Sequence, residues 1–257
     1  MKKRNSELME MLEYLELFAL EERFKAICDS PKFSSLDSVQ LLQELVAAEY
    51  DFRKEDRLDR LLRHSKLGKN TALASNLKSG NGRIYNENVI RQILTLGFVE
   101  KRLNLCIFGQ SGIGKTYAAK AIGAECCRGE YKTYFTDCTT LIDELLIMKT
   151  TDPAKYNKKL KYFGKIQVLI LDDFLITHIN EERASILFQL IKLREVFGTS
   201  TVVTCQYPAD DWGDFMGDQN EPALSDANPQ TADFRLYSEH RNSIIYAVPF
   251  RTLAVLF

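Results

Sequence analysis

Apolar residues near the start of the chain recur at the spacing of an amphipathic helix. Six of them share one face, and glutamates at positions 7, 10, 13 and 16 occupy the other. The six are Leu8, Met11, Leu12, Leu15, Phe18 and Ala19. The segment 29–31, Asp-Ser-Pro, ends this first predicted helix. A second, longer helical pattern, which Ser34 or Ser35 can cap, runs toward Arg63. These patterns predict a small, all-helical N-terminal module over residues 1–66.

The apolar periodicity fades over residues 67–86, where Gly, Asn and Ser accumulate. We therefore predict a linker over 67–86 and a second domain over 87–257. A helix over about 87–96, ended by Gly97, opens that domain. Four short apolar runs then alternate with helical patterns, at residues 103–108, 133–136, 167–172 and 201–205. This alternation is typical of an α/β fold, an open parallel sheet with helices on both faces.

A glycine-rich loop lies between the first of these runs and a helical pattern. Its residues match G-x-x-x-x-G-K-[ST] and are Gly109, Gln110, Ser111, Gly112, Ile113, Gly114, Lys115 and Thr116, with Tyr117 next. In such a P-loop the backbone N–H groups and the helix N-terminus contact phosphate oxygens. Lys115 would neutralise the β and γ phosphates, and the Thr116 hydroxyl would bind Mg²⁺. The sequence thus predicts an ATP–Mg²⁺ site here.

Two carboxylates follow the buried run at 168–171. Ligands of open α/β sheets bind beyond the carboxyl ends of the strands, where both Asp172 and the P-loop fall. Asp172 is our candidate for holding Mg²⁺, and Asp173 for polarising the water that attacks the γ-phosphate. Without the P-loop, a solvated turn after a strand would explain this pair as well.

Three further residues are candidates for contact with the phosphates. Gln206 follows the run at 201–205, where a polar group can sense the γ-phosphate. Arg235 and Arg251 are candidates for stabilising the transferring phosphoryl group, although a lone arginine is more often a surface residue.

Charge and composition limit the remaining classes. The chain has 257 residues, 45% of them apolar and 27% charged, with a formal net charge of -1. No apolar stretch approaches the length of a membrane span, so we expect a cytoplasmic protein without a membrane partner. The six cysteines form no C-x-x-C pair, which favours core thiols over a zinc or disulfide framework.

Basic residues recur near position 60 at spacings of mostly three, which would gather them on one helix face. They are Arg53, Lys54, Arg57, Arg60, Arg63 and Lys66. Such a stripe can lie along the phosphates of duplex DNA without reading its sequence. It can equally be a solvated helix face, because Glu55, Asp56 and Asp59 are interleaved with it. The aromatic residues Phe33, Tyr50 and Phe52 could be core residues or part of a partner surface, and we predict that they are core residues.

Four segments carry a family resemblance over most of the chain. They are residues 60–67 (RLLRHSKL), 108–117 (FGQSGIGKTY), 169–174 (LILDDF) and 203–212 (VTCQYPADDW). With these segments the sequence resembles the IstB family, the ATP-binding proteins of bacterial insertion sequences, within the helicase-loader clade of AAA+ ATPases. The last segment separates this family from other P-loop proteins.

The resemblance implies an AAA+ core of five parallel strands, a DNA-binding helical N-terminal domain, and ATP-dependent homo-oligomers on duplex DNA that recruit and stimulate a transposase. It also implies that Arg235 acts on the ATP of a neighbouring subunit and that Arg251 is a second sensor. The sequence departs from the family at Phe234, where an Asp is usual. A replicative helicase loader is an alternative of the same fold. A nucleotide-binding scaffold or small-molecule kinase is an alternative of another class.

Overall fold

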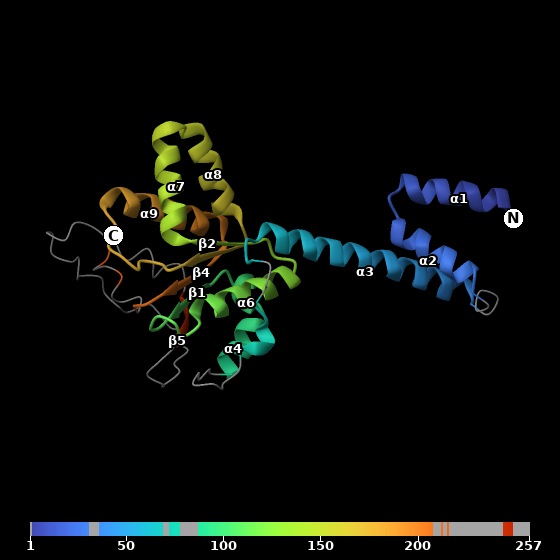
Figure 1. Ribbon diagram of the computed structural model, residues 1–257, viewed down its shortest axis with the longest axis horizontal. Helices are drawn as coiled ribbons and strands as arrows, with labels where there is room; N and C mark the ends of the chain where they lie inside the picture. The colour runs from blue at the N-terminus through green and yellow to red at the C-terminus, as the bar shows by residue number, and fades with distance from the viewer. Residues whose placement is uncertain are drawn as a thin grey trace. The chain divides into compact units, whose positions relative to one another are not determined.

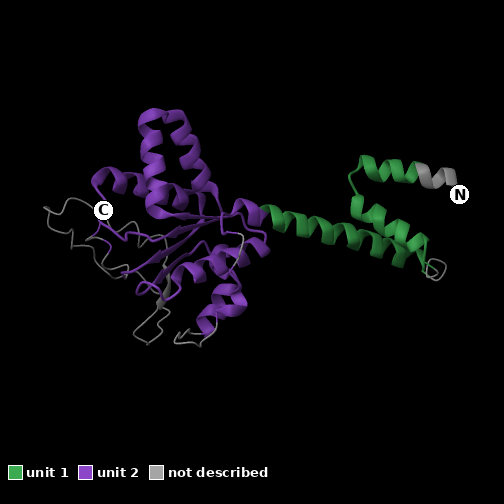
Figure 2. Ribbon diagram, in the orientation of Figure 1, with its two compact units in different colours: residues 1–60 green, residues 61–257 purple. Residues whose placement is uncertain are grey.

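The computed structural model describes residues 2–30, 36–68, 72–77, 87–207, 212, 215 and 244–248. The chain divides by packing into two units, residues 1–60 and 61–257 (Figure 2). This division lies N-terminal to the boundary that the sequence predicts. The functional division into 1–66, 67–86 and 87–257 stays a prediction.

The first unit is helical. Its elements are α1 (Lys2–Tyr14), α2 (Phe18–Cys28) and most of α3 (Ser38–His64). The sequence predicts one helix where the structure has α1 and α2, because Glu16 adopts a left-handed conformation, with φ 56°, that turns the chain. Asp37 starts α3, since its Oδ1 accepts hydrogen bonds from the N–H groups of Val39 and Gln40, each at 2.8 Å.

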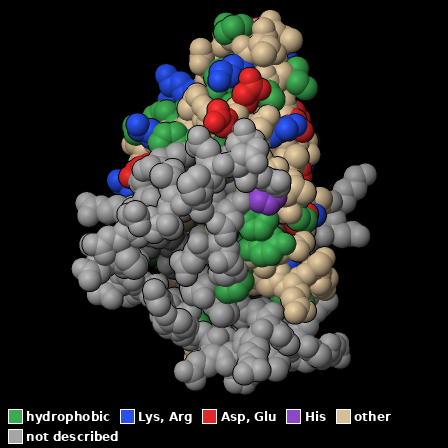
Figure 3. All heavy atoms as spheres, turned by 90° about the vertical axis from the view of Figure 1, so that its left-hand side faces the viewer, with side chains coloured by type: hydrophobic (Ala, Val, Ile, Leu, Met, Phe, Trp, Pro, Cys, Tyr) green, Lys and Arg blue, Asp and Glu red, His purple; other side chains and the backbone are tan. Residues whose placement is uncertain are grey.

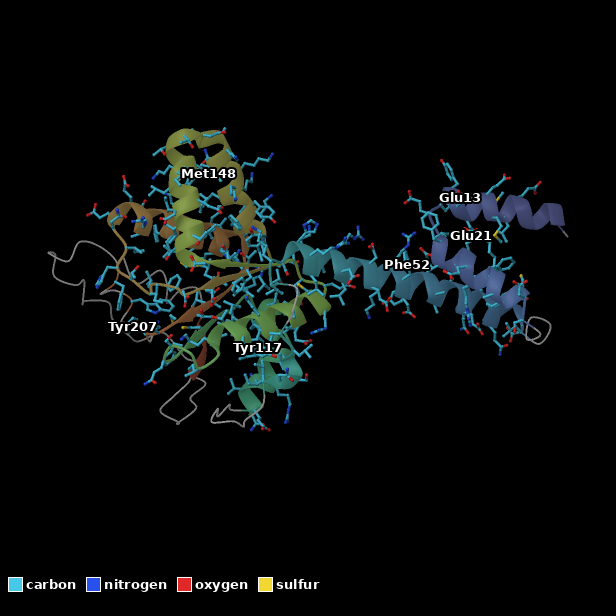
Figure 4. All side chains as sticks on the ribbon, viewed as in Figure 1. Glu13, Glu21, Phe52, Tyr117, Met148 and Tyr207 are labelled. Atoms are coloured by element: carbon cyan, nitrogen blue, oxygen red, sulfur yellow. The ribbon has the colours of Figure 1, made fainter. Side chains whose placement is uncertain are left out.

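This unit buries few of its apolar residues. Leu12, Ile27 and Leu45 are buried, whereas Tyr50 and Phe52 are 63% and 48% exposed (Figure 4 labels Phe52 on α3). The prediction that Tyr50 and Phe52 are core residues is wrong, and Phe33 lies outside the described residues. The physical reason is that each helix in a three-helix unit buries only one face. These two aromatic residues, Tyr50 and Phe52, lie outside the buried face of α3.

The second unit contains a five-stranded sheet. Its strands are β1 (Asn104–Phe108), β2 (Thr133–Asp137), β3 (Val168–Asp172), β4 (Ser200–Cys205) and β5 (Ile244–Val248). Their spatial order is β2-β3-β4-β1-β5. The four apolar runs of the sequence therefore become β1 to β4, which pair in parallel, and the predicted α/β fold class is confirmed.

The prediction of five parallel strands needs a correction at β5. This strand pairs with β1 in the antiparallel direction, with Cys106 opposite Tyr246. A parallel fifth strand requires a crossover connection that returns the chain to the same end of the sheet, whereas an antiparallel strand can enter from the opposite end. Four parallel strands and one antiparallel edge strand form the sheet.

Helices cover both faces of the sheet (Figure 1). They are α4 (Glu87–Leu94), α5 (Gly97–Glu100), α6 (Lys115–Arg128), α7 (Cys138–Thr151), α8 (Pro153–Lys165) and α9 (Glu181–Phe197), with a short 3₁₀ turn, η2, at Ala74–Asn76. The helices α7, α8 and α9 pack together on one face, and α6 lies on the other. Gly97 begins α5 rather than only ending the preceding helix as the sequence predicts.

A buried arginine connects α9 to the sheet and to the end of α8. Arg194 of α9 is fully buried, and its guanidinium donates hydrogen bonds to the Thr201 hydroxyl at 2.9 Å and the Ile166 carbonyl at 3.0 Å. It also donates to the carbonyls of Phe163 and Ser200. These contacts join α9, the turn between α8 and β3, and the start of β4. None of the helices in the described ranges has the length and hydropathy needed to cross a membrane.

Candidate nucleotide-binding site

The P-loop follows β1 directly and ends where α6 begins. Gly112 and Gly114 have φ values of 81° and 102°, a region that other residues rarely adopt. A Cβ on Gly112 would meet no atom within 4 Å, so the backbone conformation, not space, requires glycine there. Gly114 is the N-cap of α6 and brings no side chain to cap it. The first N–H groups of α6 therefore lack a side-chain acceptor from the N-cap, which suits an anion.

Lys115 is folded over this loop. Its side chain is largely buried, and Nζ donates hydrogen bonds to the carbonyl oxygens of Gly109 at 2.7 Å and Gln110 at 2.9 Å. These bonds hold the ammonium group within the loop. An anionic ligand on the loop would find this charge within reach of its phosphates.

Thr116 and Asp172 meet across 56 residues of sequence. The Thr116 hydroxyl donates a hydrogen bond to Asp172 Oδ1 at 3.1 Å. Asp172 ends β3 and is buried, with 8% of its surface exposed. The structure thus brings the end of the P-loop and the first predicted carboxylate into direct contact.

Thr204 completes this contact, and the sequence did not indicate that it would contact Asp172. Its hydroxyl donates to Asp172 Oδ1 and accepts a hydrogen bond from the Asp173 N–H at 3.0 Å. Its side chain is completely buried in β4, which lies between β1 and β3. A polar residue in an otherwise apolar strand was the available signal, but its partners follow only from the strand order.

Asp173 adopts an unusual backbone conformation at the end of β3. Its φ is 52°, and its carboxyl group is half-buried. Burial raises the pKa of Asp173 above its ordinary value, the neighbouring charges of Asp172 and Asp137 raise it further, and Lys115 lowers it. A carboxyl group with a raised pKa is a better proton acceptor once it is ionised.

The donor set fits a small, hard divalent cation. The Thr116 hydroxyl and the Asp172 carboxylate supply oxygen atoms at one point, and Mg²⁺ binds through one or two carboxylates together with substrate phosphates. Among the described residues, no group of three or more His, Cys, Asp or Glu side chains forms a separate metal site. A cation here would therefore depend on phosphate oxygens for the rest of its ligands.

Other predicted site residues are placed as follows. The Tyr117 hydroxyl accepts hydrogen bonds from the Leu73 N–H at 3.2 Å and from Asn76 Nδ2 at 2.9 Å, so it fixes η2 to α6 (Figure 4 labels Tyr117). Gln206 is half-buried directly after β4. Arg235 and Arg251 lie outside the described residues.

The predicted basic stripe is partly occupied by ion pairs. Arg53 contacts Glu49 at 2.7 Å, and Arg60 contacts Asp56 at 3.1 Å. Lys54 Nζ lies 5.9 Å from the centroid of the Tyr50 ring. Lys66 belongs to the second unit, where Nζ lies 5.4 Å from the centroid of the Tyr134 ring. Arg57 and Arg63 also lie on α3.

Several known proteins are similar to this chain. Residues 10–227 match the family model described as IstB-like ATP binding protein. The chain is 30% identical over 191 residues to an insertion sequence ATP-binding protein of Pseudomonas fluorescens, a match that covers 74% of this chain and 80% of that protein. A protein of the same description from Geobacillus stearothermophilus is 29% identical over 204 residues, or 79% of this chain and 80% of the relative.

Solved structures of replication proteins are also similar. The DnaC helicase loader matches with 25% identity and a TM-score of 0.44, over 53% of this chain and 77% of the loader. DnaI matches with 23% identity and a TM-score of 0.45, over 62% of this chain and 80% of that one.

Proposed function

The chain belongs to the IstB-like family of insertion sequence ATP-binding proteins, and from this premise we propose that it is an ATPase of transposition. It binds ATP with Mg²⁺ at residues 109–117, assembles on duplex DNA in that state, and recruits and stimulates a transposase at the target. Hydrolysis releases the assembly. In this proposal the protein acts in the cytoplasm on duplex DNA of any sequence.

The contact between Thr116 and Asp172 is the observation that carries the proposal. A P-loop sequence alone predicts phosphate binding, whereas the 3.1 Å hydrogen bond puts a second oxygen ligand beside it. The flanking Lys115 ammonium supplies the positive charge that phosphates require. These three groups together support a nucleotide with a metal ion rather than a simple anion site.

Each residue of the site has a separate role in hydrolysis. The loop N–H groups and Lys115 orient the phosphates. Thr116 and Asp172 would hold Mg²⁺, which would neutralise charge that develops on the phosphates. Asp173 accepts the proton of the attacking water. Thr204 holds the Asp172 carboxylate and the backbone of Asp173 in place through its two hydrogen bonds. Gln206, at the end of the same strand, senses the γ-phosphate.

The site is completed, in this proposal, by a neighbouring subunit. Arg235 reaches the γ-phosphate of the next protomer, and Arg251 contacts the nucleotide of its own. The support for these roles is the family resemblance of the surrounding sequence. The helical module 1–66 would then contact DNA or the transposase, with Arg53, Lys54, Arg57, Arg60, Arg63 and Lys66 as its predicted DNA-binding residues.

Nucleotide binding by paired variants tests this proposal. Lys115→Ala removes the phosphate-binding charge, so we expect a fluorescent ATP analogue to bind at least about 100-fold more weakly. Lys120→Ala, on the same helix but with its Nζ over the Phe135 ring, is the matched control and should bind as the wild type does. Equal affinity in Lys115→Ala and wild type would refute the proposed site.

A further inference from the structure

The helix α8 carries five lysines and no acidic residue. Its 13 residues read PAKYNKKLKYFGK. Lys155, Lys158, Lys161 and Lys165 follow one another at steps of three, three and four, so they share one face of the helix. All four are exposed. The result is a row of like charges, which we call the α8 lysine row.

The opposite face of α8 fixes the direction in which this row points. Tyr156, Leu160 and Phe163 are buried in the core, and the Tyr156 hydroxyl donates a hydrogen bond to Gln189 Oε1 of α9 at 3.0 Å. Asp152 caps the helix by accepting a hydrogen bond from the Lys155 N–H at 2.9 Å. Because α8 is held on one side, the lysine row faces outward.

Among the described residues, nearby acidic groups do not form ion pairs with the row. Glu144 of α7 pairs at 3.0 Å with Lys159, which lies outside the row, and the Asp152 carboxylate accepts a hydrogen bond from the backbone N–H of Lys155. Within the described part of the chain, neither Lys155, Lys158 nor Lys161 forms an ion pair. Like charges at this spacing repel one another, and an anionic partner on the exposed face of α8 would relieve this repulsion.

Aromatic residues extend the surface toward the end of α3. Tyr162 lies within the lysine row and is 53% exposed, and its ring meets that of Tyr134 edge to face at 6.4 Å between centroids. Lys66 lies over the Tyr134 ring, and both the hydrogen bond to Tyr134 and the charge of Glu144 raise the pKa of Lys66. One residue of the predicted stripe, Lys66, thus belongs to the second unit and lies near α8.

The basic stripe on α3 differs from the α8 lysine row, because acidic residues are interleaved with its basic residues. From Glu49 to His64 it contains Glu49, Asp51, Glu55, Asp56 and Asp59, and two of its arginines are paired at 2.7 and 3.1 Å. The face shown in Figure 3 carries both acidic and basic side chains among its described residues. The absence of acidic residues from α8 distinguishes it from the α3 stripe.

We propose that the α8 lysine row, with Lys66 and Tyr162 beside it, is a surface on the ATPase unit that binds the phosphate backbone of duplex DNA. The proposal rests on the proposed function and names a surface for its DNA. From Lys155 to Lys165 the row spans about 15 Å, a length over which one DNA strand presents several phosphates. Lysines recognise phosphates as point charges, so the contact is independent of base sequence.

Binding of the full-length protein to random-sequence duplex DNA tests the proposal. With a non-hydrolysable ATP analogue present, Lys158→Gln/Lys161→Gln should bind roughly 10- to 100-fold more weakly near 0.1 M salt, and the slope of log K against log salt should fall by about 2. The control is Lys101→Gln/Lys120→Gln, which removes the same charge from residues outside α8 and should match the wild type. Both variants should keep the wild-type nucleotide affinity, and neither should have a lower Tm than the wild type.

The alternatives give different results. Wild-type protein that binds no duplex DNA would refute the proposed function and the inference with it. Wild-type binding that the α8 variant retains, with an unchanged salt slope, would overturn the inference alone. Loss of binding to polyglutamate with unchanged binding to DNA would also overturn it, since the partner would then be an acidic protein.

Discussion

At the scale of single residues, the candidate site depends on a hydroxyl group that contacts two carboxyl-bearing residues. Thr204 binds the Asp172 carboxylate and the Asp173 backbone through the same oxygen atom. Its complete burial means that water cannot replace either bond. The geometry of both acidic residues should therefore respond to the loss of one hydroxyl.

Thr204→Val should slow ATP hydrolysis more than it weakens ATP binding. The substitution keeps the shape of the side chain but leaves the Asp173 N–H without its acceptor, which costs about 1–3 kcal/mol. We expect kcat to fall about 10- to 100-fold with a change in KM below about threefold. Thr204→Ser restores the hydroxyl and should recover most of kcat. Steady-state kinetics would contradict this role if Val and Ser behaved alike.

Asp173→Asn should retain ATP binding, slow turnover and stabilise the fold. Because the folded state raises the pKa of Asp173, stability is fully present below the ordinary pKa of the carboxyl group and is lost as pH rises through the raised value. At neutral pH the ionised group is therefore unfavourable, and Asn also tolerates the left-handed backbone. We expect Tm to rise by roughly 1–3 °C at pH 7. At pH 3, where the carboxyl group is protonated, the two proteins should have similar Tm values.

At the scale of elements, α9 is attached to the sheet through Arg194. Arg194→Met should be strongly destabilising, because it leaves buried carbonyl oxygens of three segments without a donor, at a cost of about 2–5 kcal/mol. Arg183→Met, on the same helix, removes only an exposed ion pair with Asp143 and should cost below about 1 kcal/mol. Denaturant unfolding would measure both, and equal losses would contradict the role of Arg194.

The sequence predicted those features that are local. The P-loop, the four parallel strands and the acidic pair at the end of β3 each follow from a contiguous pattern. Features that depend on which strands become neighbours were missed. Thr204 reaches Asp172 because β4 lies beside β3, and β5 runs antiparallel because of where the chain re-enters the sheet.

The sequence patterns also failed to predict some features of the helices. The apolar period across α1 and α2 is continuous, but the backbone at Glu16 divides it. The aromatic residues Tyr50 and Phe52 are exposed because the interior of a three-helix unit is small. The lysines of α8 are visible in the sequence, but that they all point away from the core follows only from the packing of Tyr156 and Phe163.

At the scale of the whole molecule, the proposed mechanism requires that subunits share a site. Mixing two inactive variants tests this directly. Lys115→Ala lacks a working P-loop but keeps Arg235, whereas Arg235→Ala has the reverse. In a mixed, head-to-tail assembly of equal parts, roughly a quarter of the sites would combine an intact P-loop with an intact arginine. ATPase activity should therefore reappear on mixing, and activity that stays at the level of the separate variants would argue against a shared site.

The central claim is that the nucleotide at the P-loop controls assembly on DNA. Sedimentation velocity of the protein with duplex DNA, in the presence of either a non-hydrolysable ATP analogue or ADP, measures this coupling. Our account predicts a large protein–DNA complex with the analogue, a smaller one or none with ADP, and no response to nucleotide in Lys115→Ala. Complexes of the same mass with both nucleotides would contradict it.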